Sequence, residues 1–144
     1  MPDTQAPAIT PDAFNRLTEK ALPLAHQLGF HAEAIGYGTA TVRMPFLEQF
    51  TRPGGTISGP ALMAVTDYTM YAALMGAIGP VEMAVTTNLN INFLRKPAAA
   101  DIIAECRVIK LGRTLCVLDV MLFSEGDDHP VAHATGTYAI PAET

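Results

Sequence analysis

Hydrophobic and polar positions follow several different periods along the chain. Near its start, apolar side chains recur at steps of three and four from Phe14 to Leu28, which predicts one face of a helix. A Thr-Pro pair at residues 10–11 is typical of a helix N-cap followed by the first helical position. Pro23 should kink or split this helix, and Gly29 should end it.

A period of two follows, and then a long apolar segment. Polar and apolar residues alternate from Thr39 to Met44, which predicts a single strand between residues 31 and 46. Residues 47–58 have the composition of a loop. Residues 60–77 are apolar nearly all round a helix, so we expect them to form a helix that is buried inside the domain.

The second half of the chain has the pattern of a β-sheet. Four segments with apolar residues at alternate positions are separated by turn sequences: residues 88–93, 102–108, 114–123 and 131–140. Strands joined by short turns are expected to be antiparallel neighbours. The whole order of elements predicts an α+β domain in which one antiparallel sheet packs around the apolar helix. We assign this domain to residues 10–144 and a loose N-terminal arm to residues 1–9.

The composition indicates a large core. Of the 144 residues, 49% are hydrophobic and 16% are charged, whereas roughly a quarter of the residues are charged in a typical soluble domain. The chain therefore has ample apolar material, and its low charge favours a homo-oligomer.

Charge and targeting signals limit the classes of partner and the cellular location that we expect. The net charge is −5 and the densest basic pair is Arg95–Lys96, which argues against nucleic acid as a partner and against a polybasic membrane anchor. Residues 1–10 lack the features of a signal peptide, and no apolar run approaches the length of a membrane span. We expect a cytoplasmic protein. Cys106 and Cys116 have no metal-ligand spacing around them, so we assign no metal site.

The segment around Asp67 resembles a family signature. Ser58-Gly59-Pro60 stands where the PaaI-like acyl-CoA thioesterases of the phenylacetate pathway have His-Gly-Gly, and Asp67 lies eight residues after Gly59, as their aspartate does. The sequences "NINFLRKP" and "VIKLGRTLCVLDVMLF" resemble the strand, the arginine–proline corner and the hairpin that follow in that family. The likeness covers roughly residues 30–140. It implies a hotdog fold, a long antiparallel sheet wrapped around a central helix of about residues 60–77, as in the 4-hydroxybenzoyl-CoA thioesterase superfamily.

The resemblance implies hydrolysis of an acyl-CoA thioester without a cofactor. Asp67 would act as general base or nucleophile. The N–H of Gly59, which has no side chain to block a carbonyl, would stabilise the oxyanion at the positive end of the helix. Eight helical residues span roughly 12 Å, so one chain cannot bring both groups to one carbonyl. The resemblance implies a homodimer, with each site shared between two antiparallel central helices, and we expect such dimers to assemble into a homotetramer.

Other residues receive supporting roles. Ser58 should cap the helix or bond the substrate, and a hydroxyl from Thr86 or Thr87 could hold the water or the aspartate. The remaining substrate contacts that we expect come from two places, the loop position at Arg52 and the basic pair Arg95–Lys96.

Three alternatives remain open at this point. Asp67 could have only a structural role, bonding across a dimer or to a loop amide. The protein could be a hotdog hydratase or dehydratase, although no histidine lies within twenty residues of Asp67. Because Ser58 replaces the motif histidine, the chain could also be a module that binds acyl-CoA or fatty acid without turnover.

Overall fold

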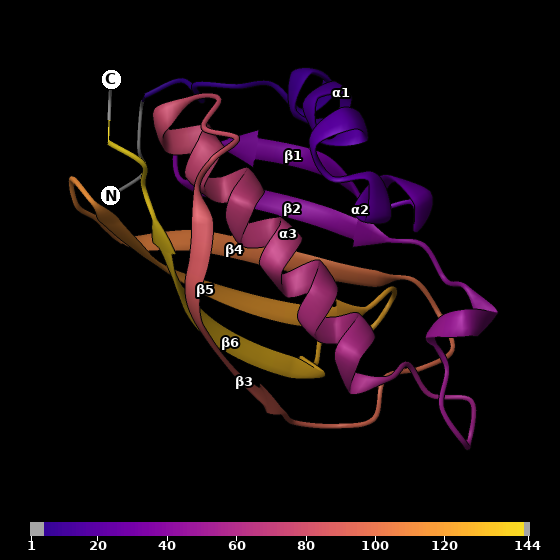
Figure 1. Ribbon diagram of the computed structural model, residues 1–144. Helices are drawn as coiled ribbons and strands as arrows, with labels where there is room; N and C mark the ends of the chain where they lie inside the picture. The colour runs from indigo at the N-terminus through magenta and orange to yellow at the C-terminus, as the bar shows by residue number, and fades with distance from the viewer. Residues whose placement is uncertain (1–4, 143–144) are drawn as a thin grey trace.

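The computed structural model describes residues 5–142, which form an antiparallel sheet wrapped around one long helix (Figure 1). The strand order is β1-β2-β4-β5-β6-β3. The elements are α1 (Pro11–Ala21), α2 (Pro23–Gln27), β1 (His31–Gly36), β2 (Thr39–Met44), a short 3-10 turn η1 (Glu48–Phe50), α3 (Gly59–Ile78), β3 (Val85–Phe93), β4 (Ile102–Leu111), β5 (Leu115–Ser124) and β6 (Ala132–Ala139). The predicted α+β architecture is confirmed.

The helices begin where the sequence predicts. The side chain of Thr10 accepts a hydrogen bond from the N–H of Ala13 at 3.1 Å and starts α1. Pro23 splits the first helix into α1 and α2. The common apolar face that we predicted from Phe14 to Leu28 is therefore interrupted. Leu24 is 66% exposed, because α2 begins a new helix axis after the proline.

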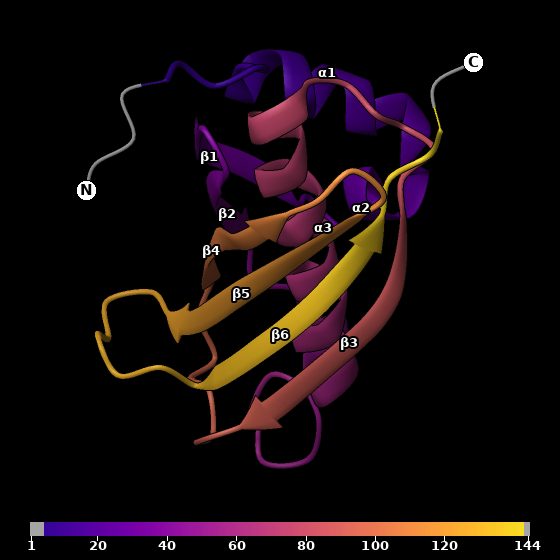
Figure 2. The same cartoon turned by 90° about the vertical axis from the view of Figure 1, so that its left-hand side faces the viewer.

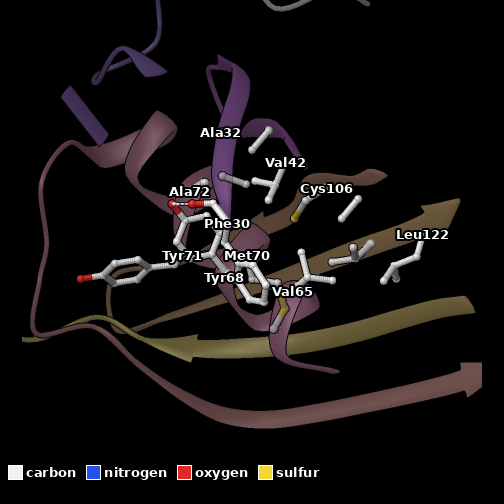
Figure 3. Close-up of a cluster of buried hydrophobic side chains, with 14 of the residues drawn as sticks. Phe30, Ala32, Val42, Val65, Tyr68, Met70, Tyr71, Ala72, Cys106 and Leu122 are labelled. Atoms are coloured by element: carbon white, nitrogen blue, oxygen red, sulfur yellow. Dashed lines mark hydrogen bonds between the residues drawn. The ribbon is translucent and has the colours of Figure 1, made fainter. Parts of the chain in front are cut away.

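The core lies between α3 and the concave face of the sheet. Val65 and Met70 of α3 are fully buried, as are Val42 of β2 and Leu122 of β5, and Figure 3 shows these side chains gathered in one cluster. By length and hydropathy, the 20 residues of α3 would be able to cross a membrane, but 72% of an 18-residue window within it is buried inside the domain. A long apolar run is therefore present after all, and its burial is that of a core helix.

Two details of the predicted sheet are wrong. The region between residues 31 and 46 contains a hairpin, β1 and β2, instead of one strand. The first strand, "HAEAIG", was missed because alanine, glutamate and glycine are uncommon in strands. Its pairing with β2 and the turn at Gly38, where φ is +77°, force the extended conformation.

The other detail concerns β3, which is not next to β4. It pairs with β6 at the far edge of the sheet, while β4 lies between β2 and β5 (Figure 2). β3 and β4 are thus three strand spacings apart, about 14 Å. The connection, residues 94–101, reaches about 25 Å when extended. It is longer than a hairpin loop and can cross the end of the sheet.

The two edges of the sheet differ. At the β1 edge, the Asn15 side chain of α1 bonds both the N–H of Ala32 (2.8 Å) and its C=O (3.0 Å), so α1 covers this edge. β3 has no strand on its outer side within residues 5–142. The described part of the predicted loose arm is held in place, since Ile9 is buried and the N–H of Ala8 donates to Gly76 O at 2.8 Å.

Candidate active site

Asp67 lies in the middle of α3, is half-buried, and has its carboxylate held on one side. Thr86 Oγ1 donates to Oδ1 of Asp67. The hydroxyl of Tyr138 lies 2.7 Å from the same Oδ1 and 3.1 Å from the main-chain carbonyl of Asp67. Oδ2 has no hydrogen-bond partner among residues 5–142. The carboxylate is thus oriented through one oxygen, and the other oxygen can accept a proton or bind water.

The two hydroxyls reach Asp67 together because of the register between β3 and β6. Thr86 and Tyr138 are directly opposite each other in this antiparallel pair, so their side chains lie on the same face of the sheet. The next residue, Thr87, is an irregularity in the register, after which Asn88 pairs with Thr137. Bulges of this kind re-aim side chains beside active sites. Here the bulge separates the face that carries Thr86 from the polar outer positions of β3.

Tyr138 is suited to donate a hydrogen bond to a carboxylate. Burial, and secondly the negative charge of Asp67, raise the pKa of Tyr138 well above its usual range. The hydroxyl therefore keeps its proton at any physiological pH. Sequence reasoning missed Tyr138, because only the pairing of β6 with β3 places it under α3. The one signal in the sequence was the alternation of side chains along the last strand, which indicates on which face of the sheet Tyr138 lies.

An apolar cavity of about 660 Å³ opens beside the carboxylate. Asp67, Thr86 and Tyr138 form its polar end. The other walls come from α2, α3 and the start of β3, and they include Leu22, Pro23, Leu24, Ala25, Leu28, Phe30, Ala64, Tyr68, Tyr71 and Val85. Pro23 turns the chain into α2, and residues in and around this short helix line one side of the cavity.

The N-terminus of α3 forms a second cleft, of about 430 Å³. Ser58 caps the helix, accepting from the N–H of Ala61 at 3.4 Å. The N–H of Gly59 has no partner within the described residues. The space beside Gly59 is not empty as expected, since a Cβ there would lie 3.3 Å from the ring of Phe93. Glycine thus permits this ring to lie against the helix start.

The basic residues singled out in the sequence gather at this second cleft. Arg52, Arg95 and Lys96 all line it together with Gly59. Arg95 lies 3.8 Å from Asp127, whereas Arg52 and Lys96 have no ion pair within residues 5–142. The helix start therefore has three cations around one free amide, which suits an anionic ligand.

The structure brings the expected residues together in two groups, not one. Asp67 and Thr86 share the apolar cavity, and Gly59 shares the basic cleft with the cations. Eight helical residues, or about 12 Å, separate the two groups along α3. Thr87 lines neither cavity, because its exposed hydroxyl donates to the carbonyl of Thr137 at 3.2 Å. We therefore leave Thr87 out of the site.

One group of side chains in the described part of the chain could hold a metal ion. It consists of Asp127, Asp128 and His129 in the exposed turn between β5 and β6. None of the three lines either cavity described above. The side chains at the two cavities offer carboxylate, hydroxyl and cationic groups, and the main chain offers the amide of Gly59.

Residues 54–131 match the family model described as "Thioesterase superfamily". The chain belongs to this superfamily. The matched segment begins just before α3 and ends at the start of β6, so it contains both Gly59 and Asp67. Among curated relatives, a protein from Saccharolobus solfataricus named "Putative esterase" is 31% identical over 117 residues, which are 81% of this chain and 77% of the relative.

Solved structures agree with this family. One from Silicibacter sp. TM1040, named a "putative thioesterase", has a TM-score of 0.85 and 40% identity, and covers 94% of both chains. A mutant of the phenylacetic acid degradation protein PaaI from Thermus thermophilus has a TM-score of 0.72 and 27% identity over 83% of this chain and 99% of that protein. The hotdog fold of the thioesterase superfamily is confirmed.

Proposed function

We propose that this thioesterase-superfamily protein hydrolyses an acyl-CoA thioester to the free acid and CoA, at a site shared between two subunits. The observation that carries the proposal is the carboxylate of Asp67. Two hydroxyls hold its Oδ1, whereas its Oδ2 has no hydrogen-bond partner within residues 5–142, and Asp67 lines an apolar cavity. A structural carboxylate would be expected to use both oxygens, whereas a general base needs one oxygen free for water.

The proposed reaction starts at Oδ2. Asp67 removes a proton from water, and the oxygen of that water adds to the thioester carbonyl carbon. The carbonyl oxygen becomes negatively charged and accepts a hydrogen bond from the main-chain N–H of Gly59 of the partner subunit. The C–S bond then breaks, and the departing thiolate takes the proton from Asp67. Direct attack by Asp67, followed by hydrolysis of the mixed anhydride, uses the same atoms, and single-turnover labelling with ¹⁸O-water separates the two routes.

A dimer through β3 would unite the two groups of residues. If two copies pair their free β3 edges around a twofold axis, their α3 helices lie side by side and antiparallel. Gly59 of one subunit then faces the partner subunit's Asp67. The same face carries exposed apolar side chains at Met63 (39%), Val85 (58%) and Phe93 (53%), which such an interface would cover.

The basic cleft supplies the contacts for the nucleotide part of CoA. Arg52, Arg95 and Lys96 lie around the helix start, where phosphates are stabilised by cations and by the helix dipole. CoA would thus bind mainly to the subunit that supplies Gly59. The acyl group would extend toward the subunit that supplies Asp67.

The first test is thiol release from a panel of acyl-CoA esters. We expect wild-type protein to hydrolyse at least one of them, and Asp67→Asn to lower kcat by about 10²–10⁴-fold. Asparagine keeps an oxygen for the hydroxyls of Thr86 and Tyr138, so the fold should survive. Asp128→Asn, which changes an exposed carboxylate in the β5–β6 turn, is the matched control and should retain full activity. Binding without turnover would instead identify a binding module.

The second test asks whether the site is shared. Asp67→Asn and the double variant Arg52→Glu, Lys96→Glu should each be inactive alone. In a mixed dimer, one site combines both defects and the other combines two intact halves. Refolding the two variants together should therefore restore about one quarter of the wild-type activity, because half of the dimers are mixed and each has one intact site. If each chain had a complete site of its own, mixing would restore nothing.

Two further expectations stay predictions. Assembly of the proposed dimers into a tetramer can be measured by light scattering on the purified protein. The cytoplasmic location can be examined by cell fractionation with an antibody.

A further inference from the structure

Away from its polar groups, the cavity beside Asp67 has walls that are mainly apolar. Its two phenol groups other than Tyr138 are already bonded. The hydroxyl of Tyr68 lies 3.0 Å from Thr18 Oγ1, and that of Tyr71 donates to the main-chain carbonyl of Glu82 at 2.9 Å. Both tyrosines therefore present ring carbon to the cavity. Their pKa values are raised, chiefly by burial, so both hydroxyls stay neutral.

The charges on the cavity lining all have one sign. Asp67 and Glu82 are the ionisable groups with a carboxylate there, and no lysine, arginine or histidine lines the cavity within the described residues. A ligand with a carboxylate at its far end would find no cation in this lining to pair with, and the negative charges of the lining would repel it. Burying an unpaired charge is far more costly than burying a methyl group.

We propose that this cavity, which we call the acyl chamber, takes an uncharged, apolar acyl group, and that α2 sets the chain length that it accepts. The proposal rests on the function proposed above. The acyl chamber belongs to the subunit that supplies Asp67. Its size, about 660 Å³, lies within the range of small-molecule sites.

α2 is the part of the wall that can vary. It has five residues, begins without a side-chain cap, and contains no buried residue. Leu22, Ala25 and Leu28, in and around it, line the chamber, whereas His26 on the same helix does not. A larger side chain at Ala25 should therefore shorten the chamber without touching Asp67.

The test compares acetyl-, butanoyl-, hexanoyl- and octanoyl-CoA with adipoyl-CoA. Adipoyl-CoA has the same chain length as hexanoyl-CoA, with a carboxylate in place of the terminal methyl group. For wild-type protein, kcat/KM should rise by about fourfold per methylene from acetyl to hexanoyl. Adipoyl-CoA should be at least about 100-fold poorer than hexanoyl-CoA. Equal rates with acetyl and hexanoyl, or with hexanoyl and adipoyl, would overturn the proposal.

Variants on α2 make the test specific to the chamber. Ala25→Phe should lower kcat/KM for octanoyl-CoA by at least about tenfold and leave acetyl-CoA unchanged. His26→Phe adds the same ring outside the chamber and should change neither. If Ala25→Phe fails to fold by circular dichroism, Leu28→Ala replaces it and should favour octanoyl over hexanoyl. A folded Ala25→Phe that loses activity equally with all chain lengths contradicts the proposal.

The outcomes separate this inference from the proposed function. If none of the five esters is hydrolysed, the thioesterase proposal fails. Calorimetric binding of hexanoyl-CoA and adipoyl-CoA then still decides the inference, since the acyl chamber should bind the first and reject the second. If esters are hydrolysed without the expected order, the enzyme stands and the acyl chamber does not.

Discussion

The close approach of α3 to β1 predicts that Gly76→Ala destabilises the protein. A Cβ at this position would lie 2.3 Å from the main-chain oxygen of Gly36 and 2.8 Å from Cγ2 of Ile35. Real Cβ contacts are essentially never shorter than 3.0 Å, so the helix and the strand end must separate. In an open helix the same change would stabilise by about 1 kcal/mol, because glycine is a poor helix former.

The magnitude follows from these opposing terms. Overpacking a core costs about 1–3 kcal/mol, and a clash with main chain belongs at the upper end because no rotamer can relieve it. With the helix-propensity gain of about 1 kcal/mol subtracted, the net loss is about 2 kcal/mol. A chain of this length should then lose roughly 6 °C in Tm.

The assay is urea unfolding of both proteins at one fixed protein concentration, since the stability of the proposed dimer would depend on concentration. Ala77→Gly, the neighbouring position on the same helix, measures the propensity term alone and should cost about 1 kcal/mol. A Gly76→Ala protein as stable as wild type, or more stable, would show that α3 and β1 are not in contact as described.

Three other predictions concern the site and its surroundings. Tyr138→Phe and Thr86→Val each leave one hydrogen-bond donor on Asp67 Oδ1, so each should lower kcat by about tenfold. The double variant should lose more activity than either single variant, because the carboxylate is then free to rotate. Steady-state kinetics on folded variants measures these losses. Ser58→Ala removes the N-cap of α3 and should cost about 1 kcal/mol in urea unfolding, with KM for acyl-CoA little changed if the serine only caps the helix. Burial raises the pKa of the Cys116 thiol from 9.0 to about 11. The neutral, buried thiol therefore contributes fully to the free energy of unfolding below about pH 9, and this contribution is lost as the pH rises through 11. In native protein at pH 8, a thiol reagent should accordingly fail to modify Cys116 and Cys106. Rapid reaction of either thiol would contradict its burial.

The sequence predicts elements well where local pattern and tertiary packing agree. α3 was expected at residues 60–77 and spans Gly59–Ile78, because its apolar residues and its flanking Ser58 and Gly79 all favour the same limits. β1 was missed because its residues favour strand only through pairing with β2. The place of β3 could not be read either, since an eight-residue connection is compatible with more than one neighbour.

The candidate site divides in the same way. Asp67 and Gly59 were found because the segment from Ser58 to Asp67 resembles the family signature, and that signature lies within one short stretch of sequence. Thr86 was proposed because it follows the helix closely, but its difference from Thr87 depends on the register with β6. Tyr138 lies 71 residues from Asp67, and no local pattern connects the two.

The division of the first helix at Pro23 has an evolutionary consequence. Asp67 itself lies on α3 and is oriented from β3 and β6, whereas one wall of the adjoining space comes from a five-residue helix outside the sheet. If the acyl chamber acts as proposed, changes in that short helix would retune selectivity for the substrate tail while the reaction centre is preserved. Proteins built on this scaffold could then diversify by exchanging this one segment.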